Sequence, residues 1–172
     1  MKQTIRLSLI CMICLLFSCN KTGQKQEFSK ICTDSTYNAT IRQYQKGDYA
    51  AVAQKIDTLL LQLEKAEMPD TIARYIGLRV LQGHTYMQLK QPPKSKAAFS
   101  KAIKQIDKRL KTDRDVNLIM NRAYLLCFMD KKEEAIQYIS SISFSKEELQ
   151  RFGKIPPLEL ISLYDKKLLQ PH

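Results

Sequence analysis

Apolar residues between residue 48 and the C-terminus recur at the spacing of an α-helix. The clearest stripe follows i, i+4, i+7, i+8 and i+11 and consists of Val52, Ile56, Leu59, Leu60 and Leu63. Further stripes of this period lie within residues 72–81, 99–110, 116–126 and 135–142. Because no long stretch alternates apolar with polar residues, strands are not expected. The sequence therefore predicts an all-α fold.

Short breaks separate these helical segments and determine how the helices connect. The breaks lie at residues 46–48, 68–70, 91–93 and 130–131. Because short connections make consecutive helices antiparallel neighbours, we expect stacked helical hairpins. About three hairpins would occupy residues 34–144, and residues 145–172 would form a C-terminal helical cap.

Residues at the segment starts predict helix caps. Asp70 is placed to cap the stripe that begins at residue 72. Both Asp113 and Asp115 precede the stripe that begins at residue 116. Ser145 and Glu148 have the spacing of a capping box. The Pro156-Pro157 pair is expected to open a last helix that runs through Leu169.

One helix pair carries the pattern of a known repeat. Gly83 and Tyr86 on the first helix are followed at the right distance by Phe99 and Ala102 on the second. This order of residues resembles the tetratricopeptide repeat (TPR), in which a glycine lets the two helices crowd together. The resemblance implies a TPR-like α–α superhelix that serves as a protein-interaction module.

The match to the repeat is incomplete. Arg79 stands where the pattern has Trp, Gln82 where it has Leu, and Ser95 where it has Ala. Weaker copies at residues 46–56 and 123–135 flank the middle one at spacings longer than the family repeat. The departures affect the expected superhelical pitch, and the stack of helical hairpins stays the prediction.

The N-terminal segment predicts where the protein is located. Lys2 and Arg6 precede an uncharged, mostly apolar run at residues 7–18, which is too short to span a membrane. The run ends in Leu16-Phe17-Ser18-Cys19, which resembles the lipobox of a bacterial lipoprotein. An uncleaved membrane anchor and a buried helix are the alternatives, and the polar residues that follow the run directly argue against both.

The lipobox resemblance implies a processed and lipid-anchored chain. Residues 1–18 would be the signal peptide, the Cys19 thiol would be diacylated, and residues 19–33 would form a flexible tether. The anchor would lie in the outer or inner bacterial membrane. Residues 20–26 contain no acid, whereas an acidic cluster there resembles a surface-export signal in Bacteroidota lipoproteins. By that analogy the domain would face the periplasm.

The cysteines and histidines predict no catalytic or metal centre. Of five cysteines, only Cys32 and Cys127 would remain unmodified, and they would form either a disulfide or two separate thiols. No CxxC pair would survive cleavage, and neither His84 nor His172 has the acidic neighbour of a catalytic or zinc-binding set. Phosphate-loop, GxSxG and HExxH motifs are also missing. We therefore predict no enzymatic activity, no cofactor and no metal.

Two surfaces are candidates for binding. In a TPR-like stack the first helix of each hairpin lines a groove, and the predicted groove residues for partner contact are Tyr37, Tyr44, His84, Gln88 and Arg122. The second candidate is a basic helix face formed by Lys94, Lys101, Lys104, Lys108 and Lys111. The alternative interpretation is that the groove residues pack against the next hairpin and that the lysines form an ordinary solvated face.

These features lead to three hypotheses for function. The first is a membrane-anchored, non-catalytic adaptor that holds a protein or peptide partner in the cell envelope. The second is a binding module for an anionic ligand, lipid or glycan, which the net charge of +11 and the basic face would attract. The third is the sensor portion of a TPR-type regulator. Nucleic acid is not expected as a partner, because no aromatic residues interleave the lysines.

Overall fold

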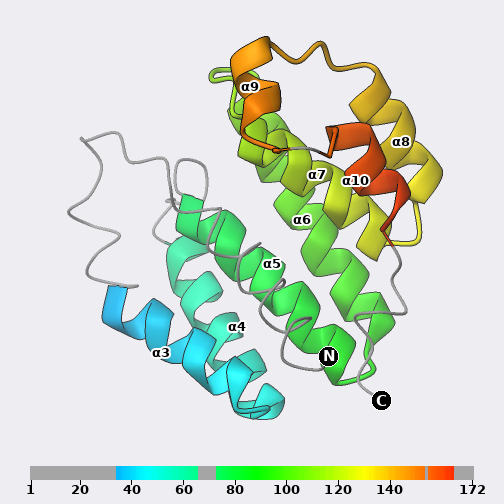
Figure 1. Ribbon diagram of the computed structural model, residues 1–172. Helices are drawn as coiled ribbons and strands as arrows, with labels where there is room; N and C mark the ends of the chain where they lie inside the picture. Colours follow the sequence, from blue (N-terminus) through cyan, green and yellow to red (C-terminus); the bar gives the residue numbers. More distant parts are fainter. Residues whose placement is uncertain (1–33, 66–72, 154, 165–172) are drawn as a thin grey trace. The chain divides into compact units, whose positions relative to one another are not determined.

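The computed structural model describes residues 34–65, 73–153 and 155–164 of the chain (Figure 1). Every regular element in these ranges is a helix, which confirms the predicted all-α fold. The described residues divide into two compact units, an N-terminal unit that ends at Gln105 and a C-terminal unit that begins at Ile106. No helix within the described ranges is long and apolar enough to cross a membrane.

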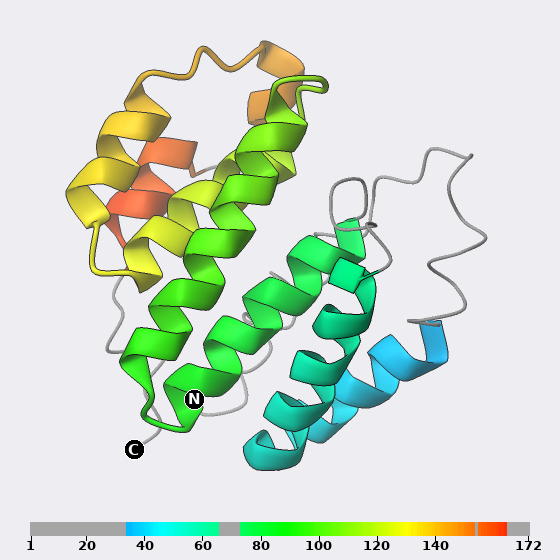
Figure 2. The same cartoon turned by 180° about the vertical axis from the view of Figure 1, so that it is seen from behind.

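The N-terminal unit is built from helices that pack as neighbours along the chain. It contains α3 (Asp34–Gln45), α4 (Tyr49–Lys65), α5 (Ala73–Gln88) and the first part of α6 (Pro92–Leu110). Helix α4 packs against both α3 and α5 (Figure 2). The stripe predicted for α4 is buried, as expected for an amphipathic helix. Gly47 has a φ of 86° in the α3–α4 turn, a backbone conformation that favours glycine.

Helices α5 and α6 meet at the glycine that the repeat pattern singled out. Phe99 of α6 has no exposed surface, and a Cβ atom added at Gly83 of α5 would lie only 2.7 Å from Cζ of the Phe99 ring and closer to two other ring carbons. Only a residue without a side chain fits there. The predicted close approach of these two helices is therefore present in the structure.

The C-terminal unit continues the pairing of neighbouring helices. It contains the end of α6, then α7 (Val116–Phe128), α8 (Lys132–Ser140), α9 (Lys146–Gln150) and α10 (Pro157–Ser162). Helix α8 packs on α7, and α10 packs on both. Cys127 lies on α7 as a free, buried thiol, and burial raises its pKa to about 11. Cys32, the other half of the possible disulfide, lies outside the described residues.

Two helix caps are present in this unit, and one of them is the predicted capping box. The Asp115 carboxylate accepts hydrogen bonds from the backbone N–H groups of Asn117 and Leu118, at 2.8 and 3.3 Å. Ser145 and Glu148 form the predicted capping box at the start of α9. The predicted cap Asp70 lies outside the described residues.

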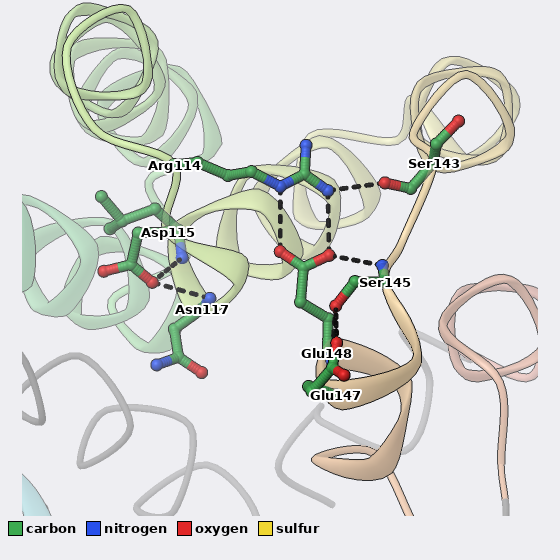
Figure 3. Close-up of polar contacts among 8 residues, drawn as sticks. Arg114, Asp115, Asn117, Ser143, Ser145, Glu147 and Glu148 are labelled. Carbon is green, nitrogen blue, oxygen red and sulfur yellow. Dashed lines mark hydrogen bonds and ion pairs between the residues drawn. The ribbon is translucent and has the colours of Figure 1, made fainter.

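Arg114 ties the capping box to the segment before α7 (Figure 3). Its guanidinium donates two hydrogen bonds to the Glu148 carboxylate, at 2.9 and 3.0 Å, and a third to the Ser143 carbonyl at 2.7 Å. The hydrogen bond from Arg114 is the main reason that the pKa of Glu148 falls to about 2. The short helix α9 is therefore held by a two-point ion pair as well as by its own cap.

The end of the chain differs from the sequence expectation. The last helix was expected to run through Leu169, but α10 ends at Ser162, and residues 165–172 lie outside the described ranges. The Lys132 ammonium donates hydrogen bonds to the carbonyls of Ser162 and Tyr164, at 2.6 and 3.0 Å, and so satisfies acceptors at this helix end. The contact with Lys132 on α8 is a tertiary interaction that a helical repeat in the sequence cannot reveal.

Candidate functional site

A buried arginine lies at the centre of a polar cluster in the N-terminal unit. Arg79 on α5 is only 4% exposed. Its Nε–H donates to the Tyr75 hydroxyl at 3.1 Å, its Nη1–H donates to the Gln82 side-chain oxygen at 2.9 Å, and its Nη2–H bonds and pairs with the Glu64 carboxylate. Because a buried charge is costly unless it is paired and hydrogen-bonded, these contacts explain how α5 accommodates the arginine.

The cluster continues toward the end of α5 through Asp57 of α4. The Gln82 amide donates to one Asp57 oxygen at 2.5 Å, and the Tyr86 hydroxyl donates to the other at 2.6 Å. Burial, followed by the hydrogen bond to Asp57, raises the pKa of Tyr86 to about 12. Tyr86 therefore stays a protonated donor at neutral pH, and one carboxylate fixes the orientation of two side chains of α5.

A cavity of about 170 Å³ lies beside this cluster, between α5 and α6. The residues that line it are Arg79, Gln82, Tyr86, Lys94, Ala97, Ala98 and Lys101, and we call it the α5–α6 groove. Three of the lining residues are cations and none is an acid. The Lys94 ammonium lies 5.3 Å from the centre of the Tyr86 ring, within the range of a cation–π contact.

The cations of the groove retain hydrogen-bonding capacity. Arg79 uses three of its N–H donors, and its other N–H groups have no partner among the described residues. Lys94 and Lys101 are exposed and form no ion pair with any residue that the structure describes. The groove thus combines a fixed guanidinium at its base with two exposed ammonium groups at its edge, an arrangement suited to an anionic group.

Three of the residues predicted to contact a partner are buried instead. Tyr37 and Tyr44 of α3 are 3% and 9% exposed, and Tyr44 packs edge-on against Tyr49. His84 is 3% exposed, lies edge-on to Phe99, and has its pKa lowered to about 3 by burial. The expectation that they face an open groove is wrong, because α5 is buried continuously from Tyr75 to Tyr86 and α3 turns these two tyrosines inward.

The other two predicted groove residues are half-buried and lie in different units. Gln88 is the last residue of α5. Arg122 on α7 donates to the Asp107 carboxylate at 2.6 Å, and its guanidinium lies 4.2 Å from the centre of the Tyr138 ring. These contacts hold the Arg122 side chain within the C-terminal unit.

The five lysines of the predicted basic face are all exposed: Lys94, Lys101, Lys104, Lys108 and Lys111. Only Lys94 and Lys101 also line the α5–α6 groove. Lys111 lies just beyond the end of α6. The predicted lipidation site, Cys19, lies outside the described residues. Within the described ranges, no cluster of three or more His, Cys, Asp or Glu side chains is arranged to hold a metal ion.

The sequence contains a signal for the α5–α6 groove at two departures from the repeat pattern. Arg79 and Gln82 stand where the TPR pattern has apolar residues. Buried polar side chains require partners, and the structure supplies partners for both residues from α4. No family model, curated protein or solved structure matches this chain. The functional argument therefore depends on the chemistry of the groove.

Proposed function

We propose that this protein is a non-catalytic docking module of the bacterial cell envelope, anchored by a lipid on Cys19. The α5–α6 groove would hold a protein partner, and the TPR-like pairing of helices would act as its scaffold. The observation that carries the proposal is the groove itself, in which Arg79 is fixed by three hydrogen bonds and still has N–H groups without a partner among the residues that the structure describes.

The groove chemistry favours binding over catalysis. Its lining offers donors and positive charge but no histidine, cysteine or carboxylate to accept a proton or attack a substrate. Tyr86, with its pKa of about 12, is held as a donor to Asp57. A rigid set of donors beside two exposed lysines fits recognition of a partner group that is bound and released unchanged.

Chemical footprinting of lysines in native membranes tests this function. An amine-acylating reagent is applied to membranes and to the full chain purified in non-ionic detergent, and the modification of each lysine is measured by mass spectrometry. A docked partner should make Lys94 and Lys101 several-fold less reactive in membranes than in the purified chain. Lys104 is the matched control, because it is exposed on the same helix but does not line the groove.

Two further results of this experiment decide between the hypotheses. Equal reactivity of Lys94 and Lys101 in both samples would contradict docking at the groove. Equal protection of all five lysines would favour the second candidate function, a basic face that contacts anionic lipid or glycan. The exposure that the five lysines share also supports this function.

The variant Cys19→Ala tests the lipid anchor. Without the acylated cysteine, the chain should no longer sediment with membranes, and the protection of Lys94 and Lys101 should be lost.

A further inference from the structure

We infer that the partner group held in the α5–α6 groove is a carboxylate side chain from an acidic segment of a protein. This inference rests on the proposed docking function and specifies the chemistry of the partner. The argument uses the charge of the groove, its volume and the apolar part of its wall.

The charge of the groove selects an anion. Arg79, Lys94 and Lys101 line it, while the two nearby carboxylates, Asp57 and Glu64, already accept hydrogen bonds from α5. The guanidinium cannot turn toward solvent, because Tyr75, Gln82 and Glu64 hold it. An incoming carboxylate would therefore meet donors that are already oriented, which lowers the entropic cost of binding.

The volume of the groove limits the size of that anion. A groove of about 170 Å³ has room for an anchoring side chain. We therefore assign the groove to a single anchoring side chain, with the rest of the partner lying outside.

The wall of the groove distinguishes a carboxylate side chain from a phosphate. Ala97 and Ala98 of α6 form an apolar part of the lining between the two lysines. The methylene groups of a glutamate or aspartate would contact this surface while the carboxylate reached Arg79. A free phosphate has no apolar stem and would leave the alanine surface without a matching contact.

Binding of a designed acidic peptide tests the inference. The probe is a fluorescein-labelled peptide of alternating glutamate and serine, and its counterpart has glutamine in place of glutamate. Fluorescence anisotropy is measured with the full chain in non-ionic detergent. The glutamate peptide should bind at least about tenfold more tightly than the glutamine peptide, and its affinity should fall several-fold when salt rises from about 50 to about 300 mM.

Four variants assign that binding to the groove. Lys94→Gln and Lys101→Gln should each weaken it by about two- to fivefold, whereas Lys104→Gln on the same helix should leave it unchanged. Asp57→Asn removes the carboxylate behind Gln82 and Tyr86 but retains an acceptor oxygen, so affinity should rise about twofold. A gain of affinity cannot be produced by a variant that merely fails to fold.

The controls separate failure of this inference from failure of the docking function. Equal losses from Lys94→Gln and Lys104→Gln would overturn the inference in favour of a diffuse basic face. Displacement of the peptide by inorganic phosphate at the concentration at which free glutamate displaces it would also overturn it. If the two peptides bind equally while lysine footprints in membranes still show protection of the groove, docking stands and the acidic partner is excluded.

Discussion

Replacing Phe99 by alanine should lower the free energy of unfolding of the protein by about 3–5 kcal/mol, because the ring is fully buried and fills the space between α5 and α6. The surrounding helices cannot collapse into that space without moving His84, which lies edge-on to the ring at 5.2 Å. Chemical denaturation of the full chain in non-ionic detergent, followed by circular dichroism, measures the change.

Gly83→Ala, measured with and without the Phe99 ring, tests the contact between these two residues directly. Gly83→Ala should cost about 1–3 kcal/mol in the wild-type chain, because the added methyl group overlaps the Phe99 ring. In the Phe99→Ala background the same change should be neutral, or stabilising by up to about 1 kcal/mol through the helix propensity of alanine. An equal cost of Gly83→Ala in both backgrounds would contradict the proposed packing. Gly47→Ala is the control, since no atom lies near its added Cβ and its cost reports only the positive φ.

Replacing Arg79 by alanine should lower the free energy of unfolding by about 2–4 kcal/mol. The change leaves the buried Gln82 oxygen without its donor, which costs about 1–3 kcal/mol, and it opens space where the arginine stem packed. Glu64 adds little to this cost, because its side chain is 39% exposed and can return to water. Denaturation curves for single variants test the estimate.

Glu64→Gln is the matched variant for the other side of the same ion pair. It should cost less than about 1 kcal/mol, because an exposed partner contributes little and the glutamine oxygen still accepts from Arg79. We therefore expect Glu64→Gln to lower the free energy of unfolding much less than Arg79→Ala does. If Glu64→Gln is as destabilising as Arg79→Ala, the cluster depends mainly on charge pairing with Glu64, which would contradict the small contribution expected from this exposed carboxylate.

Local signals in the sequence predicted much of the fold. The stripe at Val52 and Ile56 predicted the buried face of α4, and the spacing of Ser145 and Glu148 predicted the capping box of α9. Gly83 and Phe99 predicted a close helix crossing, because a glycine leaves room for a large ring on the neighbouring helix. Each of these signals acts over a few residues or within one helix pair.

The polar cluster around Arg79 could not be predicted from the sequence. Arg79 meets Glu64 at a sequence separation of 15 residues, and Gln82 meets Asp57 at a separation of 25. Helical periodicity predicts which face of its own helix a residue occupies, but it does not identify the residue that it contacts on another helix. The same limit applies to His84. Its position in the repeat predicts an open face, but the structure buries α5 continuously from Tyr75 to Tyr86.

Site-specific photocrosslinking in native membranes tests the central claim most directly. A benzophenone amino acid replaces Ala97 inside the α5–α6 groove, and the control places it at Lys104 on the same helix. We predict that position 97 captures one partner through a segment containing Asp or Glu, that position 104 does not, and that Lys94→Gln with Lys101→Gln removes the product. Capture that is equal from both positions, or unchanged by the two lysine substitutions, would contradict a docking function for this groove.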